Sequence, residues 1–174
     1  MTLVVLLGGA RSGKSALAVR IAAETGAPVT FVATARAGDE EMAERIRRHR
    51  QERPKEWSTI EEPVDVVAAI DRAPAADTLV VDCLSLWVAN VLDEVDDLEE
   101  RASAAASACA ARPGLTVAVS NEVGLGIVPA TPLGRRYRDV LGCVNTIWAE
   151  LADEAHLVVA GRALRLEPAA HILR

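Results

Sequence analysis

The 174-residue chain carries 25 acidic against 19 basic side chains, a formal charge of −6, which argues against a surface that binds a nucleic-acid backbone. Its hydrophobic fraction of 51% is sufficient for a core covered on two sides, so we expect residues 1–174 to form one domain. The longest apolar stretch, residues 79–92, is interrupted by polar side chains and is shorter than the roughly 20 residues of a transmembrane helix, so no membrane span is expected.

Short apolar runs alternate with longer amphipathic segments along the chain. The runs lack polar alternation, which is typical of strands covered by helices on both faces. In chain order we predict a strand at residues 3–7, a helix at 15–25, a strand at 29–33, a helix at 39–53, a strand at 57–60, a helix at 64–70, a strand at 79–82, helices at 84–92 and 98–112, a strand at 115–120, a helix at 133–152, a strand at 156–160 and an edge strand at 164–166.

This order of elements predicts an α/β fold. Right-handed crossovers between the strands would give a mainly parallel sheet with helices on both faces, and we expect the first strand to be central. Ligands of such sheets bind at the carboxyl ends of the strands. The polar loops fall at this edge, at residues 8–15, 33–39, 82–85 and 121–126.

The turn after the first strand fits the pattern G-x-x-x-x-G-K-[ST] of a phosphate-binding loop (P-loop), with a strand before it and a helix after it. The glycines let successive backbone N–H groups point inward, and the helix N-terminus adds its positive partial charge. We therefore predict that the loop binds a purine nucleoside triphosphate and that Lys14 reaches the β and γ phosphates. The loop consists of Gly8, Gly9, Ala10, Arg11, Ser12, Gly13, Lys14 and Ser15.

Two residues of the sequence suit Mg²⁺, a hard cation that prefers oxygen ligands and shares phosphate oxygens with one or two protein groups. Ser15 offers a hydroxyl, and Asp82 closes the apolar strand at residues 79–82, where P-loop proteins place an acidic residue. We predict Ser15 and Asp82 as the metal site. The alternative for Asp82 is a helix cap at the end of its strand.

A basic stretch stands out in this acidic protein, and it surrounds His49. The predicted helix places His49 on one face with Met42, Ile46 and Arg53. A neutral imidazole is a competent nucleophile at phosphorus, and neighbouring guanidinium groups would favour its unprotonated form. Without other evidence, a solvated or packed histidine and a solvated arginine face remain open as alternatives.

The cysteines indicate a reducing compartment. Cys83, Cys109 and Cys143 are odd in number, far apart and without metal-type spacing, so neither a disulfide framework nor a zinc site is expected. The apolar residues 3–7 have no basic leader before them, unlike a secretory signal. We expect a cytoplasmic protein. His156 and His171 are interpreted as structural or terminal.

Several blocks of the sequence together resemble one known family. They are the phosphate-binding loop, Val32-Ala33-Thr34-Ala35, Arg45-Ile46 with His49, Arg53-Pro54 and Trp57, the block Asn121-Glu122-Val123-Gly124-Leu125-Gly126-Ile127-Val128-Pro129, and Arg138-Asp139 with Gly142 and Val144-Asn145. On these residues the chain is similar, over nearly its whole length, to the bifunctional adenosylcobinamide kinase and adenosylcobinamide-phosphate guanylyltransferase family of cobalamin biosynthesis.

The resemblance implies an enzyme with a RecA-like P-loop NTPase fold and two activities. It would phosphorylate adenosylcobinamide with ATP or GTP, then transfer GMP from GTP to adenosylcobinamide phosphate through a guanylylated His49. It also implies a cytoplasmic homotrimer. Beyond the phosphate-binding loop, it implies nucleotide contacts at Ala33, Thr34, Ala35, Arg50, Gln51, Glu52, Arg53, Glu61 and Asp82.

Catalysis is therefore expected to depend on His49 for GMP transfer and on Lys14 for both reactions. Glu122 follows a strand end and could accept a proton or stabilise its own turn, and these two interpretations remain open. Two rival functions also remain open: a simple small-molecule P-loop kinase without a covalent step, and a nucleotide-gated regulatory protein.

Overall fold

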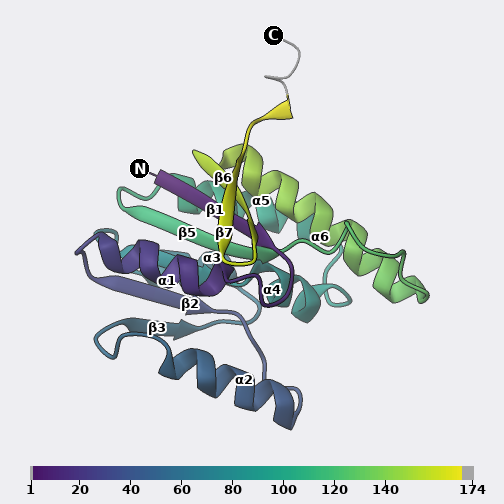
Figure 1. Cartoon of the computed structure of the whole chain (residues 1–174), viewed down its shortest axis with the longest axis horizontal. Helices are drawn as coiled ribbons and strands as arrows, with labels where there is room; N and C mark the ends of the chain where they lie inside the picture. The colour runs from purple at the N-terminus through teal and green to yellow at the C-terminus, as the bar shows by residue number, and fades with distance from the viewer. Residues whose placement is uncertain (1, 170–174) are drawn as a thin grey trace.

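The computed structural model describes residues 2–169 and forms a seven-stranded sheet flanked by helices (Figure 1). Strand order across the sheet is β3-β2-β4-β5-β1-β6-β7. The strands are β1 (Thr2–Gly8), β2 (Val29–Ala33), β3 (Ser58–Glu61), β4 (Thr78–Asp82), β5 (Leu115–Asn121), β6 (Glu154–Val159) and β7 (Arg162–Leu166). The helices are α1 (Lys14–Glu24), α2 (Glu40–Gln51), α3 (Val66–Arg72), α4 (Leu84–Val91), α5 (Leu98–Ala110) and α6 (Pro132–Leu151).

The parallel sheet that the sequence predicts is confirmed. Strands β1 to β6 pair in parallel, and β7 pairs antiparallel with β6 at the edge of the sheet. The expectation of a central first strand needs a correction, because β5 holds the middle place and β1 lies next to it. Both strands are inner strands, and their continuous apolar sequences do not distinguish the two places.

Helices cover both faces of the sheet, as the lack of polar alternation in the strands predicts. In β1, Leu3, Val5 and Leu7 belong to one buried cluster, whereas Val4 and Leu6 belong to another, because successive side chains point to opposite faces. The first cluster includes side chains of α3, α4, α5 and α6, and the second includes those of α1. The core is therefore divided into two layers by the sheet.

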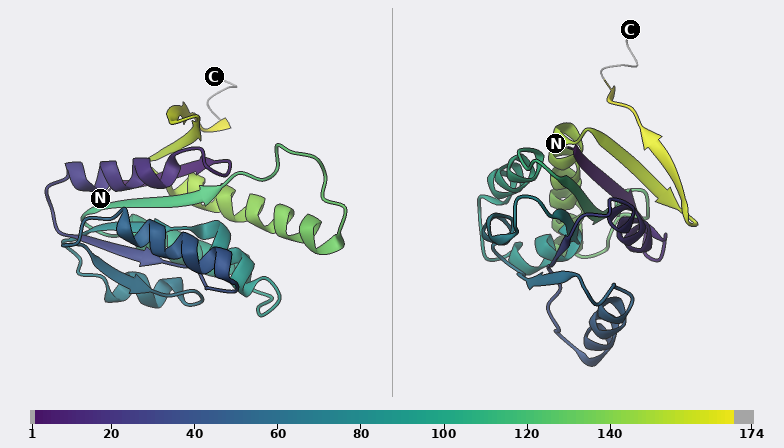
Figure 2. Two further views of the ribbon diagram at one scale, coloured as in Figure 1. Left: turned by 60° about the horizontal axis from the view of Figure 1, so that its bottom comes forward. Right: turned by 90° about the vertical axis from the view of Figure 1, so that its left-hand side faces the viewer.

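Helix α2 differs from the other helices because it has no buried residue. Figure 2 shows it standing away from the sheet, beyond the edge that β3 forms. Its N-terminus is nonetheless well defined by the Asp39 side chain, which accepts a hydrogen bond of 2.7 Å from the N–H of Met42. The helix is thus capped at its start, and its residues are at most half-buried.

Within residues 2–169, none of the helices combines the length and the apolar content that crossing a membrane requires.

Candidate functional site

The phosphate-binding loop is shaped by two glycines. A Cβ atom on Gly8 would overlap the carbonyl oxygen of Val158 and lie 2.7 Å from Ser12 Oγ, so only glycine fits there. Gly13 has a φ of 98°, in the left-handed region that favours glycine, and serves as the N-cap of α1. Since glycine has no capping side chain, the first N–H groups of α1 are left for an anion.

A second element supports the same loop. The N–H of Gly161, in the turn between β6 and β7, donates to the carbonyl of Ser12 at 2.8 Å. A Cβ on Gly13 would lie 3.2 Å from the Cα of Gly161. The hairpin thus packs directly on the loop. The sequence did not predict this support of the loop. The only signal for it in the sequence is the Ala160-Gly161 turn before the predicted edge strand.

Lys14 is buried within the loop, where 7% of its surface is exposed. Its ammonium donates to the carbonyl of Gly9 at 3.0 Å. Burial lowers the pKa of Lys14, and the positive charge of Arg45 contributes in the same direction, while the Cys83 and Asp82 groups oppose it. A buried cation held by the loop backbone is suited to an anionic ligand, because a phosphate would offset its desolvation.

Ser15 and Asp82 lie together at the carboxyl edge of the sheet. Burial raises the pKa of the Asp82 carboxyl, and the neighbouring Ser15 side chain and nearby cations oppose that rise in part. The helix-cap alternative for Asp82 does not apply, since α4 begins at Cys83 without a side-chain cap. A hydroxyl and a carboxylate in contact suit Mg²⁺ that takes its remaining ligands from phosphate and water. Residues 2–169 contain no group of three or more His, Cys, Asp or Glu side chains that could hold a metal ion.

Two adjoining cavities lie between the phosphate-binding loop and α2. One, of about 650 Å³, includes the loop residues Arg11 to Ser15, and the other, of about 330 Å³, reaches the strand ends. Lys14, Ser15 and His49 line both cavities. The second cavity is also lined by six more of the predicted nucleotide-contacting residues: Ala33, Ala35, Arg50, Arg53, Glu61 and Asp82.

Polar contacts hold α2 opposite the loop. The guanidinium of Arg53 lies 3.6 Å from the centroid of the Phe31 ring on β2, a cation–π contact. Arg50 forms an ion pair with Glu61 at the end of β3. These two contacts fix the C-terminal end of α2, and the face with His49 is turned to the cavities. The solvated alternative holds for other arginines of the helix, since Arg47 and Arg48 form exposed ion pairs.

Three of the predicted nucleotide-contacting residues do not line the second cavity. The Thr34 side chain is buried and bonded to the backbone of Cys83, donating to its carbonyl at 2.7 Å and accepting from its N–H at 2.9 Å. Gln51 is exposed and lies outside both cavities, and Glu52 lines only the larger one. Thr34 therefore connects the ends of β2 and β4 with its side chain, and its carbonyl accepts a further hydrogen bond of 2.7 Å from the Asn90 side chain.

Two further predictions from the sequence concern side chains outside the cavities. The Glu122 carboxylate accepts a hydrogen bond from the N–H of Gly124, which is the turn-stabilising interpretation. The ring of His156 pairs with Glu154 at 2.9 Å on β6, a structural role. His171 lies outside the described residues.

Comparison with known proteins decides the family. Residues 4–166 match the family model described as cobinamide kinase / cobinamide phosphate guanyltransferase. The chain belongs to this enzyme family. It is 45% identical over 166 residues to the bifunctional adenosylcobalamin biosynthesis protein CobP of Pseudomonas aeruginosa, covering 94% of this chain and 96% of the relative. It is also 36% and 37% identical to the CobU proteins of Escherichia coli and Salmonella typhimurium, each over 95% of this chain and 99% of the relative.

Solved structures of other proteins confirm the RecA-like P-loop fold of this family member. The chain is similar to the RadB recombinase, with a TM-score of 0.52 and 12% identity over 90% of this chain and 73% of the other. It is also similar to an ATPase of a bacterial type III secretion system, with a TM-score of 0.54 and 9% identity over 99% and 60% of the two chains. At such identities the likeness concerns the fold alone.

Proposed function

We propose that residues 1–174 act as one bifunctional enzyme domain that phosphorylates adenosylcobinamide and then transfers GMP from GTP to adenosylcobinamide phosphate. The family to which the chain belongs supports both activities. The single observation that carries the proposal is that His49 and the phosphate-binding loop line the same two cavities. A bound triphosphate would thus lie between a loop that binds phosphates and a side chain that can attack them.

In the GMP-transfer reaction, a nitrogen of the His49 imidazole attacks the α phosphorus of GTP. The N–P bond forms as the bond to the β-phosphate oxygen breaks, pyrophosphate leaves with the electron pair, and the imidazole proton passes to solvent. The phosphate oxygen of the acceptor then displaces the imidazole and forms adenosylcobinamide-GDP. Lys14 and the loop N–H groups neutralise the leaving pyrophosphate.

In the kinase reaction, the terminal phosphate of ATP or GTP passes directly to the aminopropanol hydroxyl of adenosylcobinamide. Catalysis depends on positioning and charge stabilisation by the loop N–H groups and Lys14. Ser15 and Asp82 would hold Mg²⁺, which supplies Lewis-acid stabilisation of phosphate charge when it is bound. His49 has no role in this step, so the two activities are separable.

The proposal extends to assembly and compartment. We propose a cytoplasmic homotrimer, as the family resemblance implies. Large apolar side chains are exposed on the segment between β5 and α6 and at the start of α6, which is a surface that a second subunit would cover. These side chains are Leu125, Ile127, Val128 and Leu133. Sedimentation of the purified protein tests the trimer.

Labelling with GTP that carries ³²P at the α phosphorus tests the covalent step. The wild-type protein should acquire acid-labile label that maps to His49. The His49→Ala variant should acquire none, yet it should still phosphorylate adenosylcobinamide, whereas Lys14→Ala should lose both reactions by about 100-fold or more. Label on His49→Ala equal to that of the wild type would rule out the histidine intermediate.

The same labelling experiment separates the rival functions. A simple kinase would transfer the terminal phosphate and acquire no label from the α position. A regulatory protein would bind nucleotide without releasing pyrophosphate when adenosylcobinamide phosphate is added.

A further inference from the structure

The basic stretch on α2 contains one arginine that the fold does not use. Of the five arginines between residues 45 and 53, four have partners: Arg47 pairs with Glu44, Arg48 with Glu52, Arg50 with Glu61, and Arg53 stacks on Phe31. Among residues 2–169, Arg45 has no hydrogen bond or ion pair. A guanidinium without a protein partner is available for a ligand.

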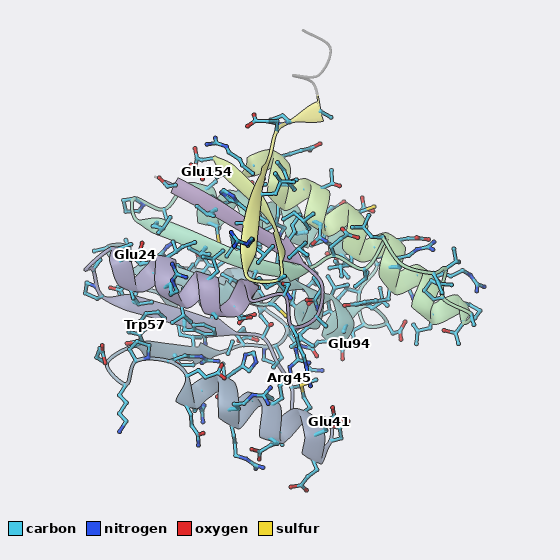
Figure 3. The ribbon with its side chains drawn as sticks, viewed as in Figure 1. Glu24, Glu41, Arg45, Trp57, Glu94 and Glu154 are labelled. Carbon is cyan, nitrogen blue, oxygen red and sulfur yellow. The ribbon has the colours of Figure 1, made fainter. Side chains whose placement is uncertain are left out.

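Arg45 also occupies a distinctive place. It precedes His49 by four residues, which puts the two side chains on one face of α2, one turn apart. Arg45 lines both cavities, as do Lys14, Ser15 and His49, which are the loop residues and the nucleophile of the proposed reaction. Figure 3 places it at the edge of α2 nearest the sheet. Its positive charge is among those that lower the pKa of Lys14.

We propose that Arg45 is a further catalytic residue, which binds the β and γ phosphates of the nucleotide from the side opposite Lys14 and stabilises the charge that develops on them. This inference rests on the proposed function and adds a residue to it. Arginine suits the role because its planar guanidinium donates two parallel hydrogen bonds to phosphate oxygens.

In both steps, negative charge develops on the β phosphate, where a cation at that position would stabilise it. When His49 attacks the α phosphorus, the breaking P–O bond leaves its electron pair on the β-phosphate oxygen of pyrophosphate. When the terminal phosphate is transferred to a hydroxyl, the electron pair of the breaking bond also remains on the β phosphate. Arg45 would therefore contribute to both reactions, whereas His49 contributes to one.

Single-turnover rates of both steps test the proposal in Arg45→Ala and Arg45→Lys, with Arg47→Ala as the matched control. Arg47→Ala removes the same charge from the same helix, but from a guanidinium that pairs with Glu44. Arg45→Ala should slow both steps by about 100-fold, with a much smaller increase in the Kd of GTP, because the contact is strongest in the transition state. Arg45→Lys should recover part of the loss, because it keeps the charge without the bidentate geometry.

The proposal is wrong if Arg45→Ala slows neither step more than Arg47→Ala does, or if the Kd of GTP rises as much as the rate falls. Thermal unfolding of each variant shows that the exposed substitution leaves the fold intact. Wild-type protein that acquires no label on His49 overturns the covalent mechanism, and phosphoryl transfer in a His49→Ala background then still decides the role of Arg45. Wild-type protein that transfers neither group overturns the proposed function and this inference together.

Discussion

The phosphate-binding loop and α2 form opposite walls of one site, yet they are held in different ways. The loop is fixed by the core: Lys14 is buried, Gly8 packs against the backbone of β6, and Gly161 donates to the loop at 2.8 Å. Helix α2 has no buried residue and is held by Arg53 over Phe31 and by the pair of Arg50 with Glu61. One wall is thus specified by backbone packing and the other by charged side chains, of which Arg53 is half-buried and Arg50 is exposed.

Because the two walls are held differently, mutations in them should have different consequences. Changes at the packed positions of the loop should disturb both the stability of the sheet and every reaction of the bound nucleotide, because the loop joins β1 to α1, whose apolar side chains belong to one core cluster. Changes in α2 should leave the stability of the sheet intact and alter the transfer chemistry, with His49 affecting GMP transfer alone and Arg45 affecting both reactions. Three variants test this comparison, and they follow in order of expected effect.

The largest effect is expected from Gly8→Ala. The new methyl group would overlap the carbonyl oxygen of Val158, and either β1 or β6 must shift. We expect a loss of about 1–3 kcal/mol of stability, which for a chain of this length lowers the Tm by roughly 2 to 12 °C. Gly9→Ala is the matched control, since a Cβ there meets no atom within 4 Å. Equal Tm values for the two variants would show that the loop is less tightly packed than described.

Asp82→Asn should have a smaller effect that depends on pH. Burial raises the pKa of Asp82, so the folded state binds a proton at this carboxyl more tightly than the unfolded chain does. The group therefore favours folding below its unfolded pKa and loses that contribution as the pH rises through the folded pKa. In the absence of nucleotide and Mg²⁺, Asp82→Asn should raise the Tm at pH values above the folded pKa of Asp82. Each kcal/mol of stability gained corresponds to about 2–4 °C, and the gain should vanish at pH values below the unfolded pKa.

A control with the opposite sign is available for this experiment. A hydrogen bond from Arg101 lowers the pKa of the exposed Asp97. Asp97→Asn should therefore lower the Tm at pH values above the unfolded pKa of Asp97, and it should not raise the Tm there. Thermal unfolding measured across the pH range compares the two variants. A Tm difference for Asp82→Asn that does not change with pH would contradict the assigned cause.

The smallest effect is expected from Arg53→Met, which keeps an apolar side chain over Phe31 and removes the guanidinium. The loss of the cation–π contact amounts to about 0.5–1 kcal/mol, so amide hydrogen exchange in α2 should accelerate by a factor of about 2 to 5, with α1 unchanged. Arg48→Met serves as the control, because Arg48 pairs only with Glu52, at 3.9 Å. Unchanged exchange in α2 would show that the helix does not depend on this contact.

The sequence by itself determined the fold class, the order of all the strands and helices, and the phosphate-binding loop. These features are local: apolar runs bounded by turns predict strands, and the pattern at residues 8–15 requires the same backbone geometry in any surrounding. The ends of β2 were predicted to the residue, and those of α1 and α6 to within one residue, because glycine, proline and capping side chains mark them.

Only the tertiary structure decided which distant side chains meet. The place of β1 beside the middle strand, the support of the loop by the β6–β7 turn and the inward bond of Thr34 to Cys83 all depend on strand order, which periodicity does not encode. The same holds for the arginines of α2, which are alike in sequence. Their partners lie on β2, on β3 or on the helix itself, so only the packed structure distinguishes Arg45 from its neighbours.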